Sequence, residues 1–380
     1  MDFSQLIEKI NKEFGDTVIS GTLPPRERIP FSSPYLNYVT YGGIVYGSSS
    51  EFVGAESSGK STLAQDLISQ FQKIEAVRFA KRKEELQTAI AKAKGKELER
   101  LTSQLEATKE RKTVYLDLEF TLDGVWLNKL GVDASKVFII QPQAMGVETP
   151  LDWIIQLAET EEVGFIIIDS IGAMVSGAEE EKSLNDATYG GISKALTRFY
   201  KKVMPYVKKN NIALLVINQT RDDMNNPYNQ FNRPGGRMNK FAQSLSLGLS
   251  GGEKLDEKYG DATGKSEMVH ARVSNVQMIK NKTAPPDRQR TKFTIKHGRG
   301  IDQAFDVFGM ACDLGMVAVA GAYYTFFDPE NGVELKKVQG KSKAVEFLRA
   351  NDDLRNKLWK RLYDESLLKD DFVENIEEEV

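Results

Sequence analysis

The most informative part of the chain is residues 54–62, which read GAESSGKST and fit the pattern G-x-x-x-x-G-K-[ST]. An apolar β-like run ends at Val53, and a helix-like run over 63–71 follows, which is the context that a phosphate-binding loop needs. In such a loop, backbone N–H groups and the helix N-terminus bind phosphate oxygens. The predicted nucleotide-binding residues are Gly54, Glu56, Ser57, Ser58, Gly59, Lys60, Ser61 and Thr62.

Two side chains of this loop have separate expected tasks. Lys60 is expected to reach the β- and γ-phosphates of ATP, and the Ser61 hydroxyl to bind Mg²⁺. ATP and Mg²⁺ are therefore the expected cofactors. The alternative is an accidental glycine-rich turn, which the complete motif in its proper context disfavours.

Composition excludes several other classes of protein. With 41% hydrophobic residues, a chain of 380 residues can bury one large core with smaller attachments. A single cysteine excludes a disulfide framework and favours a reducing cytoplasm. The N-terminus does not resemble a signal peptide, and no apolar run approaches the ~18 residues that would span a membrane. We therefore expect a cytoplasmic protein without a membrane partner.

Three short runs, 114–116, 165–168 and 213–217, are apolar on both faces, as central parallel strands are. Helix-like segments such as 151–160 and 190–207 separate them. This alternation after a P-loop predicts an α/β fold with a central, mainly parallel sheet. Ligands of such sheets bind at the carboxyl ends of the strands.

Polar residues end each of these three runs. Asp169 is expected to hold Mg²⁺, with capping of the next helix as its alternative task. Glu119 is the candidate general base for the water that attacks the γ-phosphate. Asp117 lies on the same face of that strand and competes for this role. Gln219 can bind the γ-phosphate and sense its hydrolysis.

Three segments stand apart from this alternating plan. Residues 4–14 carry apolar positions at helical spacing and continue into a proline-containing linker. Residues 72–112 predict a helical hairpin; from 81 to 112 it carries ten basic and six acidic residues, a net charge of +4. A solvated excursion without a task is an equal alternative there. Residues 370–380 hold six acidic and no basic residues, as disordered tails do.

Residues 221–236 form a polar loop with two aromatic side chains and a glycine pair at its end. Arg221 is suited to a phosphate contact, and Tyr228 or Phe231 to stacking on bases. A polar loop with aromatic side chains and a glycine-containing end suits a contact that follows a nucleic-acid backbone. Taken alone, the loop fits an ordinary surface loop equally well.

Several spaced motifs resemble the RecA family of homologous-recombination ATPases over roughly residues 35–71 and 113–362. They are the P-loop, D-x-E-x-x-x-D at 117–123, GVD at 131–133, QP at 141–142, INQ at 217–219, GG at 235–236, KF at 240–241 and KNK-x-AP at 280–285. The resemblance implies a RecA-like core over 35–320 with the hairpin inserted, a small C-terminal domain over 321–369 and a protomer-docking arm over 1–34.

The resemblance also implies roles for individual residues. Catalysis falls to Glu119, Lys60 and Gln219; Asp123 and Trp126 flank adenine, with Trp126 where the family has a tyrosine. Lys280 and Lys282 reach the ATP of a neighbouring protomer, and Lys240 and Phe241 lie at that interface. The implied DNA contacts are Lys194, Lys201, Arg221, Gly235 and Gly236.

The implied function is a DNA-dependent ATPase that forms helical filaments on single-stranded DNA and exchanges strands with homologous duplex DNA. Loader or single-strand-binding proteins are further expected partners. A ring-forming motor or helicase is one alternative, although such motors more often use an arginine finger where this chain has Lys280 and Lys282. A weakly hydrolysing scaffold is another, and the presence of Glu119 argues against it.

Two departures from the family pattern concern DNA. The first loop, 176–190, is acidic, and Asn275 and Gln277 stand where the family often has basic residues. The second DNA site is therefore expected elsewhere, at Arg288 and Arg290 or on the hairpin. Such divergence suits a phage-encoded or accessory recombinase.

Overall fold

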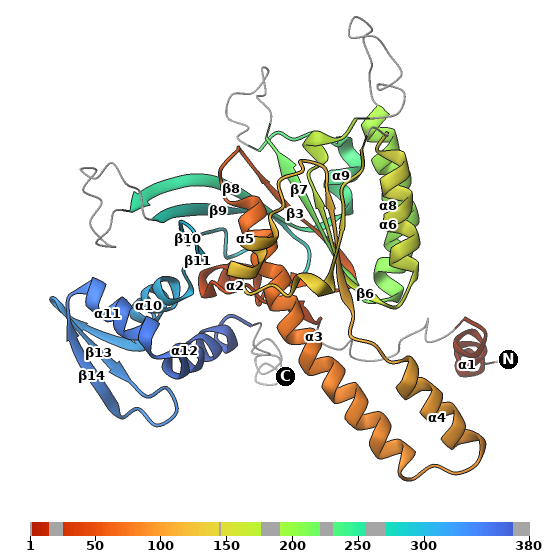
Figure 1. The fold of residues 1–380 in the computed structure, drawn as a ribbon, viewed down its shortest axis with the longest axis horizontal. Helices are drawn as coiled ribbons and strands as arrows, with labels where there is room; N and C mark the ends of the chain where they lie inside the picture. Colours follow the sequence, from red (N-terminus) through yellow and green to blue (C-terminus); the bar gives the residue numbers. More distant parts are fainter. Residues whose placement is uncertain are drawn as a thin grey trace, which may run out of the picture.

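The structure, a computed structural model, describes residues 2–14, 26–143, 146–175, 191–220, 231–255 and 271–367. Its centre is a nine-stranded sheet of order β11-β10-β9-β8-β3-β7-β6-β4-β5 (Figure 1). These strands are β3 (Ser48–Gly54), β4 (Lys112–Asp117), β5 (Val137–Ile140), β6 (Val163–Asp169), β7 (Ala213–Gln219), β8 (Gln243–Leu255), β9 (Ala271–Asn281), β10 (Arg290–Lys296) and β11 (Gly300–Ile301). Strands β8 to β5 pair in parallel, and β9 to β11 continue in antiparallel pairs. The predicted α/β fold with a mainly parallel sheet is confirmed.

Helices cover both faces of the parallel strands, which explains why the runs 114–116, 165–168 and 213–217 are apolar on both faces. α3 (Lys60–Ile90) packs on one face, and α6 (Glu148–Glu159) and α8 (Gly191–Lys209) on the other. Successive side chains of a strand point to opposite faces. In β6, Ile167 accordingly joins the core under α3, while Ile166 and Ile168 join the core under α6 and α8.

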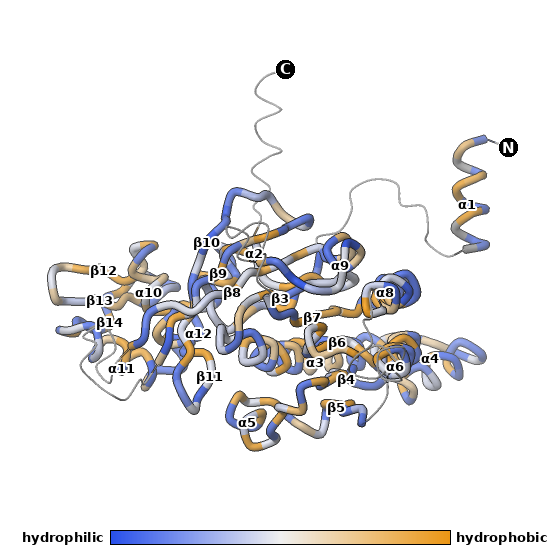
Figure 2. Tube along the Cα trace, turned by 90° about the horizontal axis from the view of Figure 1, so that it is seen from above, coloured by the Kyte–Doolittle hydropathy of each residue, from blue (hydrophilic) through white to orange (hydrophobic). Residues whose placement is uncertain are grey.

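Shorter elements surround this sheet. They are β1 (Arg28–Ile29), α2 (Pro34–Thr40), β2 (Ile44–Val45), α5 (Gly124–Lys129) and α9 (Gly236–Ala242). The N-terminal segment forms α1 (Phe3–Phe14), and Figure 2 shows hydrophobic and hydrophilic residues alternating along it. That pattern gives α1 one apolar side.

α3 is one continuous helix of 31 residues and is longer than the sequence predicts. The prediction ended the P-loop helix near Phe71 and started a separate hairpin at residue 72. Because no glycine or proline occurs between 60 and 90, nothing interrupts the helix there. Its second part projects beyond the core together with α4 (Lys96–Ala107), as Figure 1 shows. The apolar contact between the two helices is small, since Leu101 of α4 is buried but Leu98 of α4 is 38% exposed.

A fully buried carboxylate, that of Glu75 in α3, fixes the root of this hairpin. It pairs with Arg82 and with Arg111, whose Nη2 lies 3.2 Å from Glu75 Oε2. Arg111 also donates hydrogen bonds to the carbonyl oxygens of Asn210 and Asn211. Since these contacts lie where β4 and β7 begin, the hairpin is mounted at the amino-end edge of the sheet.

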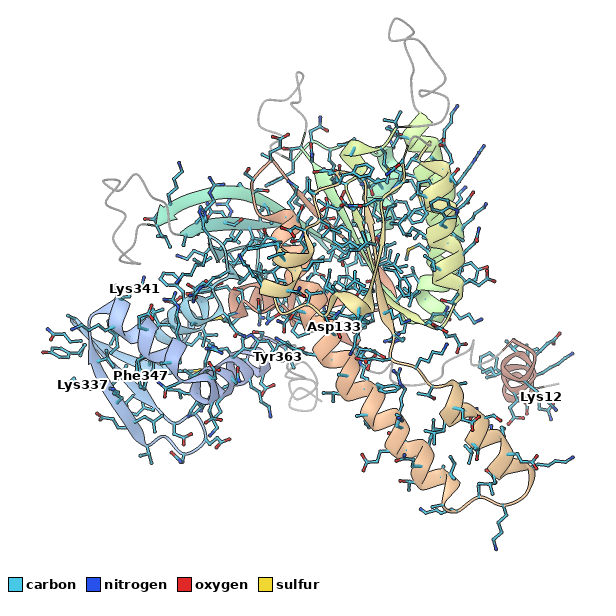
Figure 3. All side chains as sticks on the ribbon, in the orientation of Figure 1. Lys12, Asp133, Lys337, Lys341, Phe347 and Tyr363 are labelled. Atoms are coloured by element: carbon cyan, nitrogen blue, oxygen red, sulfur yellow. The ribbon has the colours of Figure 1, made fainter. Side chains whose placement is uncertain are left out.

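The C-terminal part forms a smaller unit. It contains α10 (Gln303–Asp313), β12 (Val317–Ala320), β13 (Tyr323–Phe327), β14 (Glu334–Gln339), α11 (Lys341–Ala350) and α12 (Asp352–Asp364). Phe326 and Phe347 pack in its core with ring centroids 4.9 Å apart, and Figure 3 labels Phe347 within this unit. α10 and β12 share this core, so the cluster begins before the predicted domain boundary at 321.

In the described parts of the chain, no helix has both the length and the apolar character that crossing a membrane requires. The acidic first loop at 176–190 and the tail at 370–380 lie outside those parts.

Candidate nucleotide site and its surroundings

The P-loop joins the end of β3 to the start of α3, and two of its positions require glycine. A Cβ on Gly54 would lie 2.2 Å from the carbonyl oxygen of Leu249, and Gly59 has φ +94°. Lys60 folds back under the loop, where its Nζ donates to the carbonyl oxygens of Gly54 (2.9 Å) and Ala55 (2.7 Å). The Lys60 ammonium group and the N-terminus of α3 therefore lie together at the P-loop. Both attract anions, so this position is suited to binding phosphate.

A cavity of about 560 Å³ opens at this point, within the usual size range of ligand pockets. It brings together residues that are far apart in the sequence. Its lining consists of Glu56, Ser57, Gly59, Lys60, Ser61, Thr62, Glu119, Asp169, Gln219, Arg272, Ile295 and His297. All the predicted loop residues except Gly54 and Ser58 thus share one cavity with Glu119, Asp169 and Gln219 at the carboxyl edge of the sheet.

Asp169 has the features of a metal ligand. It is 1% exposed, its Oδ2 accepts a 2.7 Å hydrogen bond from the Tyr115 hydroxyl, and the Ser61 side chain also bonds to the carboxyl group. Its buried Oδ1 has no hydrogen-bond partner among the residues that the structure describes. Burial raises the pKa of Asp169 to about 6. An unsatisfied carboxylate oxygen beside a hydroxyl fits Mg²⁺, which binds few protein ligands together with phosphate oxygens.

No group of three His, Cys, Asp or Glu side chains forms an alternative metal centre within the ranges that the structure describes.

The structure distinguishes Glu119 from its competitor Asp117. Asp117 is fully buried and accepts hydrogen bonds from the backbone N–H of Leu122 (3.1 Å) and from Gln141 Nε2 (2.9 Å), and it does not line the cavity. Glu119 is half-buried in the cavity wall and accepts from the hydroxyl of Ser170 and from Gln219 Nε2. Asp117 therefore orders the turn that presents Glu119.

Lys280 and Lys282 lie away from the cavity of their own chain, beside α9. Lys280 Nζ donates to the carbonyl oxygen of Lys240 (2.5 Å), and Lys282 Nζ to that of Phe241 (3.3 Å). Burial, and then the charge of Lys282, lower the pKa of Lys280 to about 8. Phe241 is 66% exposed. The four predicted interface residues thus form one surface cluster.

The two predicted adenine contacts, Asp123 just before α5 and Trp126 within it, do not line the cavity. Asp123 caps this helix by accepting from the backbone N–H of Val125 at 2.8 Å. Trp126 Nε1 donates to Gln65 Oε1 of α3 at 2.9 Å, which fixes the indole against the P-loop helix. Their contact with adenine remains a prediction.

Of the predicted DNA contacts, Arg221 and Tyr228 lie outside the described residues. Lys194 and Lys201 are exposed on α8, and Gly235 and Gly236, both with positive φ, start α9. The ring of Phe231 lies against Gly248 of β8, where a Cβ would be 2.5 Å from it. Phe231 is therefore packed on the sheet, and stacking on a base would require it to leave that position.

The alternative site expected for duplex DNA consists of Arg288 and Arg290, and the two residues differ in their surroundings. Arg288 donates to the carbonyl oxygens of Tyr38 (2.9 Å) and Ser366 (2.8 Å), and its guanidinium lies over the rings of Tyr38 and Tyr41. These contacts tie Arg288 to the protein. Arg290 is exposed.

Sequence reasoning missed one wall of the cavity. Arg272 Nη1 donates to the carbonyl oxygen of Ser57 (2.7 Å), and the Ser274 hydroxyl to that of Ser58 (2.7 Å). His297 lines the cavity from the end of β10. No motif marks these residues, and only the antiparallel extension of the sheet brings them to the P-loop.

Comparisons with known proteins agree with this arrangement. A family model described as the RecA N-terminal domain matches residues 104–302. Protein RecA of Thermus aquaticus is 30% identical over 355 residues, or 92% of this chain and 89% of that protein. Protein RecA of Aquifex aeolicus is 30% identical over 330 residues (86% and 81%), and that of Ruminococcus albus 29% identical over 351 residues (91% and 75%).

Proposed function

Since this chain belongs to the RecA family, we propose that it is a DNA-dependent ATPase that assembles as a helical filament on single-stranded DNA and pairs that strand with homologous duplex DNA. One observation carries the ATPase part: Lys60, Glu119, Asp169 and Gln219 line a single cavity. A cation, a candidate base, a metal ligand and an amide donor are the groups that phosphoryl transfer to water needs.

The chain's own residues divide this reaction between them. Lys60 and the P-loop N–H groups bind the phosphates of ATP. Glu119 accepts a proton from the attacking water, and Gln219, now bonded to Glu119, donates to the γ-phosphate. When bound at Ser61 and Asp169, Mg²⁺ neutralises phosphate charge.

Neighbouring protomers complete the site in this proposal. Lys280 and Lys282 are held at the carbonyl end of α9, next to the exposed Phe241, rather than in their own cavity. Two lysines on a surface can reach the nucleotide of an adjacent subunit, which would make hydrolysis depend on assembly. Single-stranded DNA would promote assembly through the segments before α8 and α9.

The test combines electron microscopy with an ATPase assay. With single-stranded DNA and a slowly hydrolysed ATP analogue, helical filaments are expected, and DNA should stimulate ATP hydrolysis by the same chain. Lys60→Ala should abolish both, because it removes the phosphate-facing cation. Closed rings, or hydrolysis indifferent to DNA, would contradict the proposal.

A further inference from the structure

A second fully buried acid, Glu51 of β3, has no role in the chemistry described above. It lies three residues before Gly54, and its side chain is 0% exposed. Its Oε2 is 2.8 Å from Nε of Arg233, whose side chain is 7% exposed. A buried carboxylate is unfavourable unless it is paired and hydrogen-bonded, so this arrangement needs an explanation beyond packing.

Three further donors complete the surroundings of Glu51. Asn239 Nδ2 lies 2.7 Å and Asn218 Nδ2 3.1 Å from Oε1, and the Ser246 hydroxyl lies 3.3 Å from Oε2. These groups come from α9, β7 and β8 respectively. One carboxylate thereby connects the P-loop strand with both neighbouring strands and with the helix after the 221–236 loop.

Each of these partners is adjacent to a functional element. Asn218 immediately precedes Gln219 of the cavity, and its Nδ2 also donates to the carbonyl oxygen of Pro234 at 3.1 Å. Asn239 immediately precedes Lys240, whose carbonyl oxygen binds Lys280. These hydrogen bonds join the end of β7 to the exit of the loop at Pro234, and join Glu51 to the part of α9 that binds Lys280.

The network also reaches the helix that follows the first loop. Asn239 Oδ1 accepts from the hydroxyl of Tyr200 in α8 (2.7 Å) and from Gln243 Nε2 (3.1 Å). Gln243 Oε1 accepts in turn from the Ser49 hydroxyl of β3 at 2.6 Å. The segments after both candidate DNA loops are therefore joined to the strand that carries the P-loop.

We propose that Glu51 and Arg233 are positioning residues that couple the nucleotide cavity to the 221–236 segment, so that DNA stimulation of ATP hydrolysis depends on their ion pair. The inference rests on the proposed function, because it takes 221–236 as a DNA contact. Arg233 forms the ion pair with Glu51 and holds the 231–234 segment against β3, while Lys280 lies close enough to feel the charges of both residues. Without the carboxylate, the guanidinium moves toward water and takes that segment with it.

The experiment compares three variants of the full chain. Glu51→Gln keeps the side-chain shape but removes the charge, and should lower DNA stimulation, the ratio of hydrolysis rates with and without single-stranded DNA, by about 5-fold or more. Arg233→Lys keeps the charge and should retain most of the stimulation. The double variant Glu51→Gln with Arg233→Met removes both charges, and should recover the melting temperature lost by Glu51→Gln but not the stimulation.

Glu75→Gln is the matched control, because Glu75 is equally buried and arginine-paired but lies at the opposite edge of the sheet. It should lower the melting temperature and leave DNA stimulation intact. Recovery of stimulation together with stability in the double variant would show that the pair acts on folding alone, and would overturn the inference. A parent chain indifferent to DNA overturns the proposed function and this inference with it. A parent that responds, with Glu51→Gln responding equally, overturns the inference alone.

Discussion

Gln219 donates a 2.9 Å hydrogen bond from Nε2 to Oε1 of Glu119. Gln219 is the last residue of β7 and Glu119 follows β4, and these two strands lie on either side of β6 in the sheet. The candidate base and the candidate γ-phosphate sensor are thus hydrogen-bonded to each other. This hydrogen bond must weaken when the Gln219 side chain turns toward the γ-phosphate. The hydrogen bonding of the Glu119 carboxylate therefore depends on whether Gln219 contacts a γ-phosphate.

Glu119→Gln should keep ATP binding and lower hydrolysis by about 10²-fold or more, because the glutamine cannot accept the proton of the attacking water. ATP binding by fluorescence and steady-state hydrolysis check the two parts separately. Asp117→Asn is the control: its carboxylate orders the turn before Leu122, so it should lower the melting temperature. A selective loss of hydrolysis in Asp117→Asn alone would transfer the role of base to Asp117.

A chain with both Lys280→Ala and Lys282→Ala should fold, bind ATP weakly as a monomer and lose DNA-stimulated hydrolysis. Mixing it with a Lys60→Ala chain should restore part of the activity, because some mixed interfaces pair an intact P-loop with intact lysines. The readout is hydrolysis across mixing ratios, with mixed assembly verified by cross-linking. No recovery at any ratio would argue against a shared site.

The buried carboxyl group of Asp306 in α10 predicts a pH dependence of stability. Burial raises the pKa of Asp306 to about 7, against an ordinary value of 3.8, while its Oδ2 accepts from the backbone N–H of Thr294. A raised pKa of this kind stabilises the fold fully below the ordinary value, and that contribution is lost as pH rises through about 7.

Asp306→Asn imitates the protonated form, so its melting temperature should gain on that of the parent between pH 5 and pH 8. Thermal unfolding across this range measures the difference. Asp313→Asn, an exposed position of the same helix, controls for the loss of a charge from α10. A difference that stays constant with pH would mean that Asp306 is not the titrating group.

The hairpin predicts two different outcomes for two deletions. Replacing 86–106 with a short Gly/Ser turn keeps Arg82 and Arg111 on Glu75, so fold and ATP binding should be retained. Replacing 81–110 removes Arg82 and should lower the melting temperature, since Glu75 stays buried with one partner fewer. Filament length and strand exchange by the shorter deletion then measure what the hairpin contributes. Equal stability of the two forms would contradict the role given to Arg82.

The P-loop and the strand-end residues were predictable because each depends on a local rule. A loop of fixed spacing binds phosphate, and parallel strands end at one edge, which is how Glu119, Asp169 and Gln219 come together. Strand alternation alone does not show which of Asp117 and Glu119 is the candidate base. The structure distinguishes them because Asp117 is hydrogen-bonded to Gln141 and to the turn at Leu122.

The unpredicted features depend on contacts between distant segments. Arg272 reaches the P-loop only because β9 and β10 extend the sheet beyond β8. Glu51 reads as one polar residue in a strand until Arg233, 182 positions further on, is found beside it. α3 continues past Phe71 because no helix-breaking residue marks the point where the core ends and the hairpin begins.

The position of the hairpin has a practical use in labelling. Its tip at Gly95 is open, with no atom within 4 Å of a Cβ built there, and it projects from the edge opposite the nucleotide cavity. The native thiol, Cys312, is half-buried, and burial raises its pKa to about 11, which leaves it little thiolate near neutral pH. Lys94→Cys would therefore take a maleimide dye selectively, and filament growth could be followed by light while the catalytic edge stays untouched.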